Sequence, residues 1–241
     1  TQELSQQMQA APDYEAKLDT VRRWAKEWHF RIGVHHLRGL ITADRAAREY
    51  ADLAQSVLAA LWPVVADNFA LKHGEAPGRG AMALGMGSLG AGRINAASDL
   101  DMIVIYDAAG VEASDGRRPL AARPYYARLT QAMVTAVTAL MSEGRLYEID
   151  MRLRPSGTQG PVAVSLTAFH DYQTTKAWTW EHLALTRERA VAGDPAVCQD
   201  VQAVRTEVLA LPRDPATILT EVAQMRSRIA SAKTPAGIWE A

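Results

Sequence analysis

The feature that most restricts the fold is a run of five apolar residues, Met102–Tyr106, that directly follows two closely spaced aspartates. A short run of this kind, rich in β-branched residues, is typical of a buried strand. Because alternate side chains of a strand face the same way, Asp99 and Asp101 are expected to project together from its start. Two adjacent carboxylates repel each other unless a cation lies between them. The pattern therefore predicts a divalent-metal site at the head of a buried strand.

A glycine-rich turn precedes this aspartate pair. Ala81–Met86 is a short apolar run that predicts a first strand, and Gly87 and Ser88 follow it directly. Backbone N–H groups and a hydroxyl presented at close range suit a triphosphate. Gly90 and Gly92 either belong to the same phosphate loop or serve only as turn residues. The order of these residues predicts a phosphate-binding loop beside the metal site.

A third carboxylate is expected from a later strand. Leu146–Arg154 alternates strictly, which places Asp150, Arg152 and Arg154 on one polar face. If this strand neighbours the aspartate strand, Asp150 lies against the pair. Three carboxylates could then hold two Mg²⁺ ions, or Mn²⁺, about 3.5–4 Å apart, as enzymes of in-line displacement at phosphorus do. Arg152 and Arg154 would bind the nucleotide and stabilise developing charge, or else form a solvated face or pair with carboxylates.

The remainder of the chain predicts helices on both sides of this small β-rich core. Apolar residues at spacings of three and four predict helix over 13–72, with Thr42 as the N-cap of a second helix that Pro63 kinks or restarts. Further helices are expected at Tyr125–Met141 and, after the core, at about 167–190, 194–210 and 214–230. We divide the chain into an N-terminal helical segment (1–76), a core (77–165) and a C-terminal helical segment (166–241).

Composition excludes several classes of function. The net charge of −1 gives no reason to expect bulk attraction to nucleic acid or an anionic membrane. We see no apolar run that approaches the roughly 18 residues of a membrane span, and the first residues do not resemble a signal peptide. The single cysteine, Cys198, permits no intrachain disulfide, is expected to be buried and inert, and fits a cytoplasmic location. The missing initiator methionine and the apolar end suggest a segment of something longer.

Two tryptophans and a histidine stand out in the segment Ala177-Trp-Thr-Trp-Glu-His182. Tryptophans at helical spacing usually pack in a core, so we interpret Trp178 and Trp180 as core residues, with the lining of a pocket as the alternative. His182 has no second histidine at metal-ligand spacing and is interpreted as structural.

The spacing from Gly87-Ser88 to Asp99-Leu-Asp101, with the later Asp150, resembles the nucleotidyltransferase superfamily that includes DNA polymerase β. Longer motifs resemble the bacterial bifunctional glutamine synthetase adenylyltransferase/adenylyl-removing enzyme. They cover about residues 81–195 and read Gly85-Met-Gly-Ser-Leu-Gly…Ser98-Asp-Leu-Asp101, Tyr147-Glu-Ile-Asp-Met-Arg-Leu-Arg-Pro-Ser-Gly157, Asp171-Tyr-Gln173, Ala177-Trp-Thr-Trp-Glu-His182 and Val191-Ala-Gly-Asp-Pro195.

This resemblance implies an α+β fold, with a small polymerase-β-like sheet between helical segments. That family has two similar halves: one adds AMP from ATP to a tyrosine of glutamine synthetase, and the other removes it by phosphorolysis. The segment from Ala177 to His182 resembles the C-terminal, adenylylating half. The family's metal-binding and catalytic carboxylates then correspond to Asp99, Asp101 and Asp150. The alternatives are the removing activity, or a non-catalytic module that binds glutamine synthetase or a PII signal protein.

The phosphate loop departs from that family's usual pattern, Gly-Lys-Leu-Gly-Gly, because Ser88 stands where a lysine is usual. The loop is therefore less positive, and a phosphate contact of the relatives is either absent here or supplied by Arg93.

Overall fold

A five-stranded sheet forms the centre of the computed structural model, which describes residues 2–232. Strand β1 (Gly80–Gly85) pairs antiparallel along its whole length with Met102–Asp107 of β2 (Leu100–Asp107). The free edge of β1 pairs antiparallel with β5 (Arg189–Gly193). The other edge of β2 carries two short parallel strands in succession, first β3 (Ile149–Asp150) and then β4 (Ala163–Ser165). The sheet is therefore mixed, and the α+β class expected from the sequence is confirmed.

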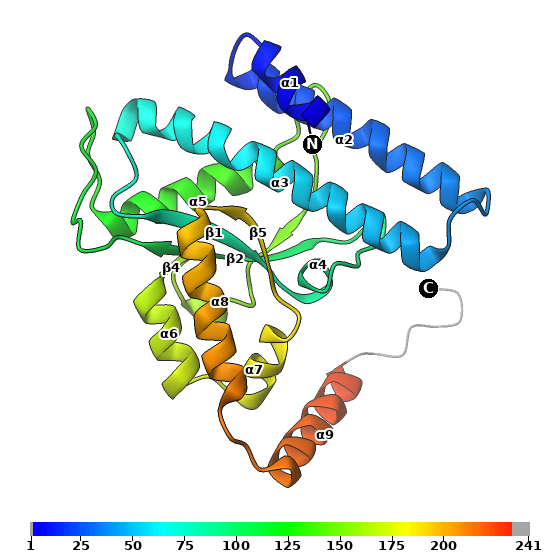
Figure 1. Ribbon diagram of the computed structural model, residues 1–241, viewed down its shortest axis with the longest axis vertical. Coiled ribbons are helices and arrows are strands. Elements are labelled where there is room, and N and C mark those ends of the chain that lie inside the picture. The colour runs from blue at the N-terminus through cyan, green and yellow to red at the C-terminus, as the bar shows by residue number, and fades with distance from the viewer. Residues whose placement is uncertain (1, 233–241) are drawn as a thin grey trace.

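Helices cover both faces of this sheet, as Figure 1 shows. Along β2, Met102, Val104 and Tyr106 join the core on one face, whereas Ile103 and Ile105 join the core on the other. The first face packs against α3 (Ala43–His73) and α5 (Ala122–Thr138); α2 (Tyr14–Leu37) packs on α3, and α1 (Gln2–Ala10) rests on α2. The second face packs against α6 (Leu166–Thr175) and α8 (Pro195–Ala210). The strict alternation explains why the run 102–106 is apolar at every position.

Four further elements complete the described chain. A single helical turn, α4 (Gly87–Gly90), links β1 to the segment before β2. A 3-10 turn (Gly157–Gln159) lies between β3 and β4. Helix α7 (Thr179–Leu185) leads into β5, and α9 (Pro215–Ala232) packs against α7 at the end of the molecule far from α1 (Figure 1).

Helix α3 is the longest helix among the described residues and crosses the sheet. The Thr42 side chain accepts a hydrogen bond from the Arg45 N–H at 3.2 Å, which confirms the expected N-cap. The helix passes through Pro63 as one element and does not restart there. Contrary to expectation, α3 is long and apolar enough to cross a membrane by length and composition alone. Its buried stripe, however, packs against α2, α5 and β5, as in the core helix of a globular domain.

A fully buried arginine ties α2 to the end of α5. Arg22 donates hydrogen bonds to the carbonyls of Ala136 at 2.7 Å, Ala139 at 3.2 Å and Gly144 at 2.9 Å. These carbonyls belong to the last turn of α5 and the loop after it, where helical carbonyls lack intrahelical donors. Arg22 thereby fixes the start of the segment that leads into β3.

Two predicted elements differ from the structure. The strand expected over Leu146–Arg154 is reduced to Ile149–Asp150, because a turn follows in which the Arg154 N–H donates to Met151, and β4 pairs with β2 from Val104 onward. The helix expected over 167–190 is two helices followed by β5. A strand of the sheet therefore comes from a region interpreted as mostly helical, while the division at 76 and 165 stays a prediction.

Candidate active site

The three aspartates selected from the sequence meet at one end of the sheet. Parallel pairing of β2 with β3 places Asp101 directly opposite Asp150. Asp99 and Asp101 alternate in step with Ile103, so their side chains belong to the face of the sheet that α6 and α8 cover. Asp150, opposite Asp101 in the parallel pair, belongs to the same face. The expected juxtaposition of Asp150 with the aspartate pair is therefore confirmed. Asp99 is exposed, whereas Asp101 and Asp150 are half-buried.

The glycine turn lies directly against one of these carboxylates. Gly87 has a φ of +56°, and a Cβ at this position would stand 2.4 Å from Oδ2 of Asp101. The Met86 N–H also donates to the Asp101 carbonyl at 2.8 Å, which closes the end of the β1–β2 ladder. Ser88 is exposed on the first turn of α4, whose leading N–H groups have no intrahelical acceptor. Glycine is thus required at residue 87 both for its backbone conformation and for the space it leaves.

The charges of the site are strongly coupled. Burial raises the pKa of the Asp101 carboxyl, and the negative charges of Asp150 and Asp99 raise it further. The cations Arg152 and Arg187 oppose this effect on the Asp101 pKa. Hydrogen bonds from Arg152 instead lower the pKa of Asp150. The site therefore holds more negative charge than its arginines neutralise at Asp101.

The two arginines expected beside the nucleotide have different surroundings. The Nε of Arg152 donates to Oδ2 of Asp150 at 2.7 Å, and its backbone N–H donates to Oδ1 at 2.8 Å. Arg154 donates to the backbone carbonyl of Met151 at 2.6 Å and, at longer range, to those of Gly160 and Thr158. Arg152 is thus an internal partner of a site carboxylate, while Arg154 braces the loop after β3. A nucleotide would have to displace these bonds, and the nucleotide-binding role of both residues stays a prediction.

The carboxylate oxygens have the donor chemistry that Mg²⁺ or Mn²⁺ requires. The excess negative charge at Asp101 also favours a cation. Within residues 2–232, however, no three side chains of His, Cys, Asp and Glu are grouped so that they could hold a metal ion. The Arg152 guanidinium also occupies the Asp150 carboxylate, to which it donates a hydrogen bond at 2.7 Å. The donor set fits a hard cation, which would replace Arg152 at Asp150.

Sequence reasoning missed one cation at this site. Arg187 precedes β5, between the motifs that end at His182 and begin at Val191, and its charge acts on Asp101. Arg93, which was considered as a replacement for the missing loop lysine, instead pairs with Asp44 of α3 at 3.1 Å. Only the pairing of β5 with β1 could have identified Arg187, and the sequence pattern did not predict that strand.

The tryptophans of the segment before β5 are not core residues. Trp178 is 68% exposed and Trp180 is 42% exposed, so the core interpretation is wrong. They line an open groove between α7 and α9, together with Leu183, Val222 and Met225. Glu181 accepts hydrogen bonds from the Tyr172 hydroxyl at 2.8 Å and from the Trp178 N–H at 2.9 Å. His182 contacts the Gln173 carbonyl and Arg213, as a structural histidine would.

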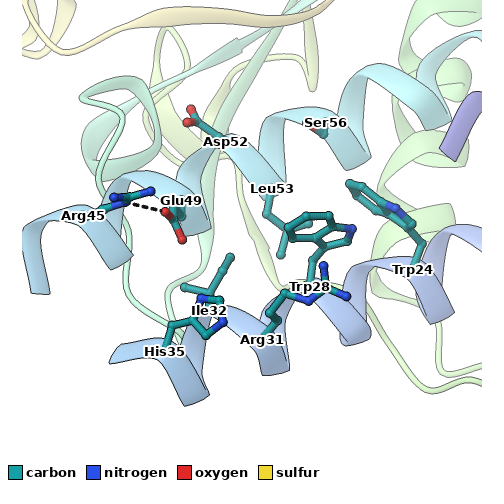
Figure 2. Close-up of a pocket in the computed structure, with 10 residues that line it drawn as sticks. All are labelled: Trp24, Trp28, Arg31, Ile32, His35, Arg45, Glu49, Asp52, Leu53 and Ser56. Carbon is teal, nitrogen blue, oxygen red and sulfur yellow. Dashed lines mark hydrogen bonds and ion pairs between the residues drawn. The ribbon is translucent and has the colours of Figure 1, made fainter. Parts of the chain in front are cut away.

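A separate pocket of about 480 Å³ lies between α2 and α3, as Figure 2 shows. Trp24 and Trp28 line it with their rings 6.0 Å apart, and the guanidinium of Arg31 lies 4.5 Å from the centre of the Trp28 ring. Asp52 also lines this pocket and lies 3.7 Å from Arg189 of β5. None of the three site aspartates lines this pocket, which is therefore distinct from the carboxylate cluster.

Comparison with known proteins identifies relatives over almost the whole chain. A family model described as glutamate-ammonia ligase adenylyltransferase matches residues 1–204. The chain is 46% identical over 228 residues to a protein of Mesorhizobium japonicum, which covers 94% of this chain and 23% of that protein. It is 43% identical over 238 residues to a protein of Bradyrhizobium diazoefficiens, which covers 98% of this chain and 24% of that protein. Both are named bifunctional glutamine synthetase adenylyltransferase/adenylyl-removing enzyme, and the chain spans about a quarter of their length.

Proposed function

Because the chain belongs to the glutamate-ammonia ligase adenylyltransferase family, we propose that it transfers AMP from ATP to a tyrosine hydroxyl of glutamine synthetase and releases pyrophosphate. The observation that carries this proposal is the meeting of Asp99, Asp101 and Asp150 beside Gly87. Phosphoryl transfer depends on positioning the reacting groups and on stabilising their charge. A carboxylate cluster next to a glycine turn with free N–H groups can supply both. The activity would regulate nitrogen assimilation in a bacterial cytoplasm and needs neither nucleic acid nor a membrane.

In this proposal the tyrosine oxygen attacks the α-phosphorus of ATP, and the bond from that phosphorus to the bridging oxygen of the pyrophosphate breaks. Asp99, Asp101 and Asp150 would hold two Mg²⁺ ions, for which Mn²⁺ could substitute. When bound, these ions would lower the pKa of the attacking hydroxyl and neutralise charge on the leaving pyrophosphate. Asp150, once Arg152 has moved from it, would complete the site of the ion at the attacking hydroxyl and help to remove the hydroxyl proton.

The remaining site residues bind the nucleotide. Gly87 and Ser88 present backbone N–H groups and a hydroxyl to the phosphates. Arg152, displaced from Asp150, would bind phosphate oxygens of the same nucleotide, with Arg154 bracing the loop that carries it. The direction of the reaction is proposed from the segment Ala177–His182, which resembles the adenylylating half of the family.

Substitution of one carboxylate tests the assignment. Asp101→Asn should lower AMP transfer to glutamine synthetase by more than about 10²-fold, because it removes charge at the centre of the cluster. Asp107→Asn is a matched control, since Asp107 lies at the other end of β2 and pairs with Arg79 at 2.9 Å. Transfer would be followed with labelled ATP, and folding by circular dichroism. A folded Asp101→Asn protein with near-normal transfer would refute the proposal.

Two alternatives make different predictions. Phosphorolytic removal of AMP uses the same carboxylates with phosphate as the attacking group, and would release ADP from adenylylated glutamine synthetase when phosphate is added. A non-catalytic module that binds glutamine synthetase or a PII signal protein would show no Mg²⁺-dependent binding of ATP by calorimetry. The carboxylate cluster favours an enzyme over such a module.

A further inference from the structure

The phosphate loop contains no lysine, so the site needs a cation from elsewhere to bind a triphosphate. Most arginines near the loop are already engaged with protein groups. Arg93 pairs with Asp44, and Arg152 pairs with Asp150 and can reach a nucleotide only after it leaves that carboxylate. Arg189 donates to the Leu89 carbonyl at 3.3 Å and lies 3.7 Å from Asp52. In the described part of the chain, Arg187 has an exposed side chain and takes part in none of the ion pairs or side-chain hydrogen bonds.

The pairing of β5 with β1 places Arg187 next to the phosphate loop. In the antiparallel register of β1 with β5, Gly85 lies opposite Arg189. Two residues further along the same register, Arg187 would lie opposite Gly87. The packing of α4 agrees, because a Cβ at Gly90 would stand 2.2 Å from the Arg187 carbonyl oxygen. The backbone of Arg187 therefore touches the turn that carries Gly87 and Ser88.

Buried anchors on both sides hold this residue in place. Leu185 is fully buried, and its carbonyl accepts a hydrogen bond from Arg205 at 2.9 Å. The side chain of Glu188 is completely buried, where it pairs with Arg205 at 3.0 Å and accepts from Gln202 at 2.8 Å. Leu185 and Glu188 are thus held in the core on either side of Arg187, and the positive charge of Arg187 lowers the pKa of Asp101. The guanidinium is close enough to act on Asp101 but is not paired with it.

We propose that Arg187 binds the β- and γ-phosphates of ATP and so supplies the cationic contact that a loop with Ser88 in place of lysine lacks. This inference rests on the proposed function. The Arg187 guanidinium has no partner among the described residues and acts on the carboxylate cluster beside the loop, so it is available to a phosphate group bound there. Guanidinium groups also bind phosphate oxygens in a bidentate manner, with charge-assisted hydrogen bonds. Arg187 is therefore assigned to the triphosphate, and the aspartates to the cations.

Direct binding of nucleotide tests the assignment. The affinity for a fluorescent N-methylanthraniloyl derivative of ATP would be measured with Mg²⁺ present, and unlabelled ATP and AMP would compete. Arg187→Gln should weaken ATP binding by about 10-fold or more, the effect of losing charge-assisted hydrogen bonds, and should leave AMP binding unchanged. Arg187→Lys should restore part of the loss. Arg93→Gln is the matched control and should bind ATP as the unchanged chain does, because Arg93 pairs with Asp44.

The outcomes separate this inference from the proposed function. If the unchanged chain binds ATP with Mg²⁺ and Arg187→Gln binds it equally well, the assignment of Arg187 is wrong and the proposed function stands. An equal loss for ATP and AMP would also overturn it, because the β- and γ-phosphates would not be what Arg187 recognises. If the unchanged chain binds no ATP with Mg²⁺ at all, the proposed function fails and the inference fails with it. Thermal melting of each variant checks that it is folded.

Discussion

Replacing Gly87 with alanine tests whether the turn positions the Asp101 carboxylate. The added Cβ would stand 2.4 Å from Oδ2 of Asp101 and 3.3 Å from its Cγ. Non-bonded heavy atoms are comfortable at about 3.5 Å, so one of the two groups must move by about 1 Å. Asp101 belongs to β2, which pairs on both edges, so the carboxylate rather than the backbone is expected to rotate away. We expect Gly87→Ala to displace the carboxylate from Asp150.

The size of the effect has two separable parts. Gly87 has a φ of +56°, and an alanine in this left-handed region costs about 1–2 kcal/mol of folding free energy. Gly92 has a φ of +69°, but the atom nearest to a Cβ there is 3.7 Å away, in the Arg189 guanidinium. Gly92→Ala therefore carries the same backbone cost without the collision. A displacement of about 1 Å in a reacting group lowers the rate by about 10²-fold, so Gly87→Ala should lose about that much activity and Gly92→Ala should not.

Two measurements on both variants test this reasoning. Urea unfolding gives the change in the free energy of unfolding, and AMP transfer to glutamine synthetase gives the change in rate. We expect similar losses of stability, with a rate loss specific to Gly87→Ala. Equal rates for the two variants would refute the claim that this turn positions Asp101. A loss of activity in both would instead indicate that backbone strain in the loop, and not the collision, controls the site.

Two further predictions concern groups outside the site. Arg22→Met should lower the free energy of unfolding by about 3 kcal/mol, because the carbonyls of Ala136 and Ala139 lose their donor. Arg23→Met should change it by less than about 0.5 kcal/mol, because Arg23 is exposed. Equal urea midpoints for the two variants would contradict this prediction. Cys198 should react slowly with a thiol reagent at pH 8, because burial raises the pKa of its thiol and leaves little of the reactive thiolate. The reaction should become faster as the pH rises. A rate as high in the native protein as in urea would contradict this prediction.

The local patterns that correctly predicted the meeting of the three aspartates are those that depend on few residues. The short apolar run predicts a strand with alternating faces, and this alternation directs the side chains of Asp99 and Asp101 to one side of the sheet. The pairing of Asp101 with Asp150 required only that β3 lie beside β2. The predictions that depend on side-chain chemistry, such as metal binding by these aspartates, remain predictions.

The errors arise where partners distant in the sequence decide the structure. Leu146–Arg154 alternates over nine residues, but β4 pairs with β2 from Val104 onward, so β3 has no partner to extend along. Strand β5 is a short segment that becomes a strand because the free edge of β1 is available to it. The apolar character of Trp178 predicted burial, yet no element of the described chain covers it. Alternation and hydrophobicity therefore indicate that a segment can form a strand or be buried, while the elements that pack beside it determine whether this happens.

Strand β5 also determines how well a truncated form of the chain would behave in solution. It lies at the outer edge of the sheet and bonds to Met82, Ala83 and Leu84 of β1, residues that are completely buried. A fragment that stopped at residue 165 would leave this apolar strand with a row of unpaired N–H and C=O groups. Such an edge is a template for the strand of another molecule, and aggregation would follow. The strand that places Arg187 and Arg189 beside the phosphate turn thus also covers the apolar edge of β1.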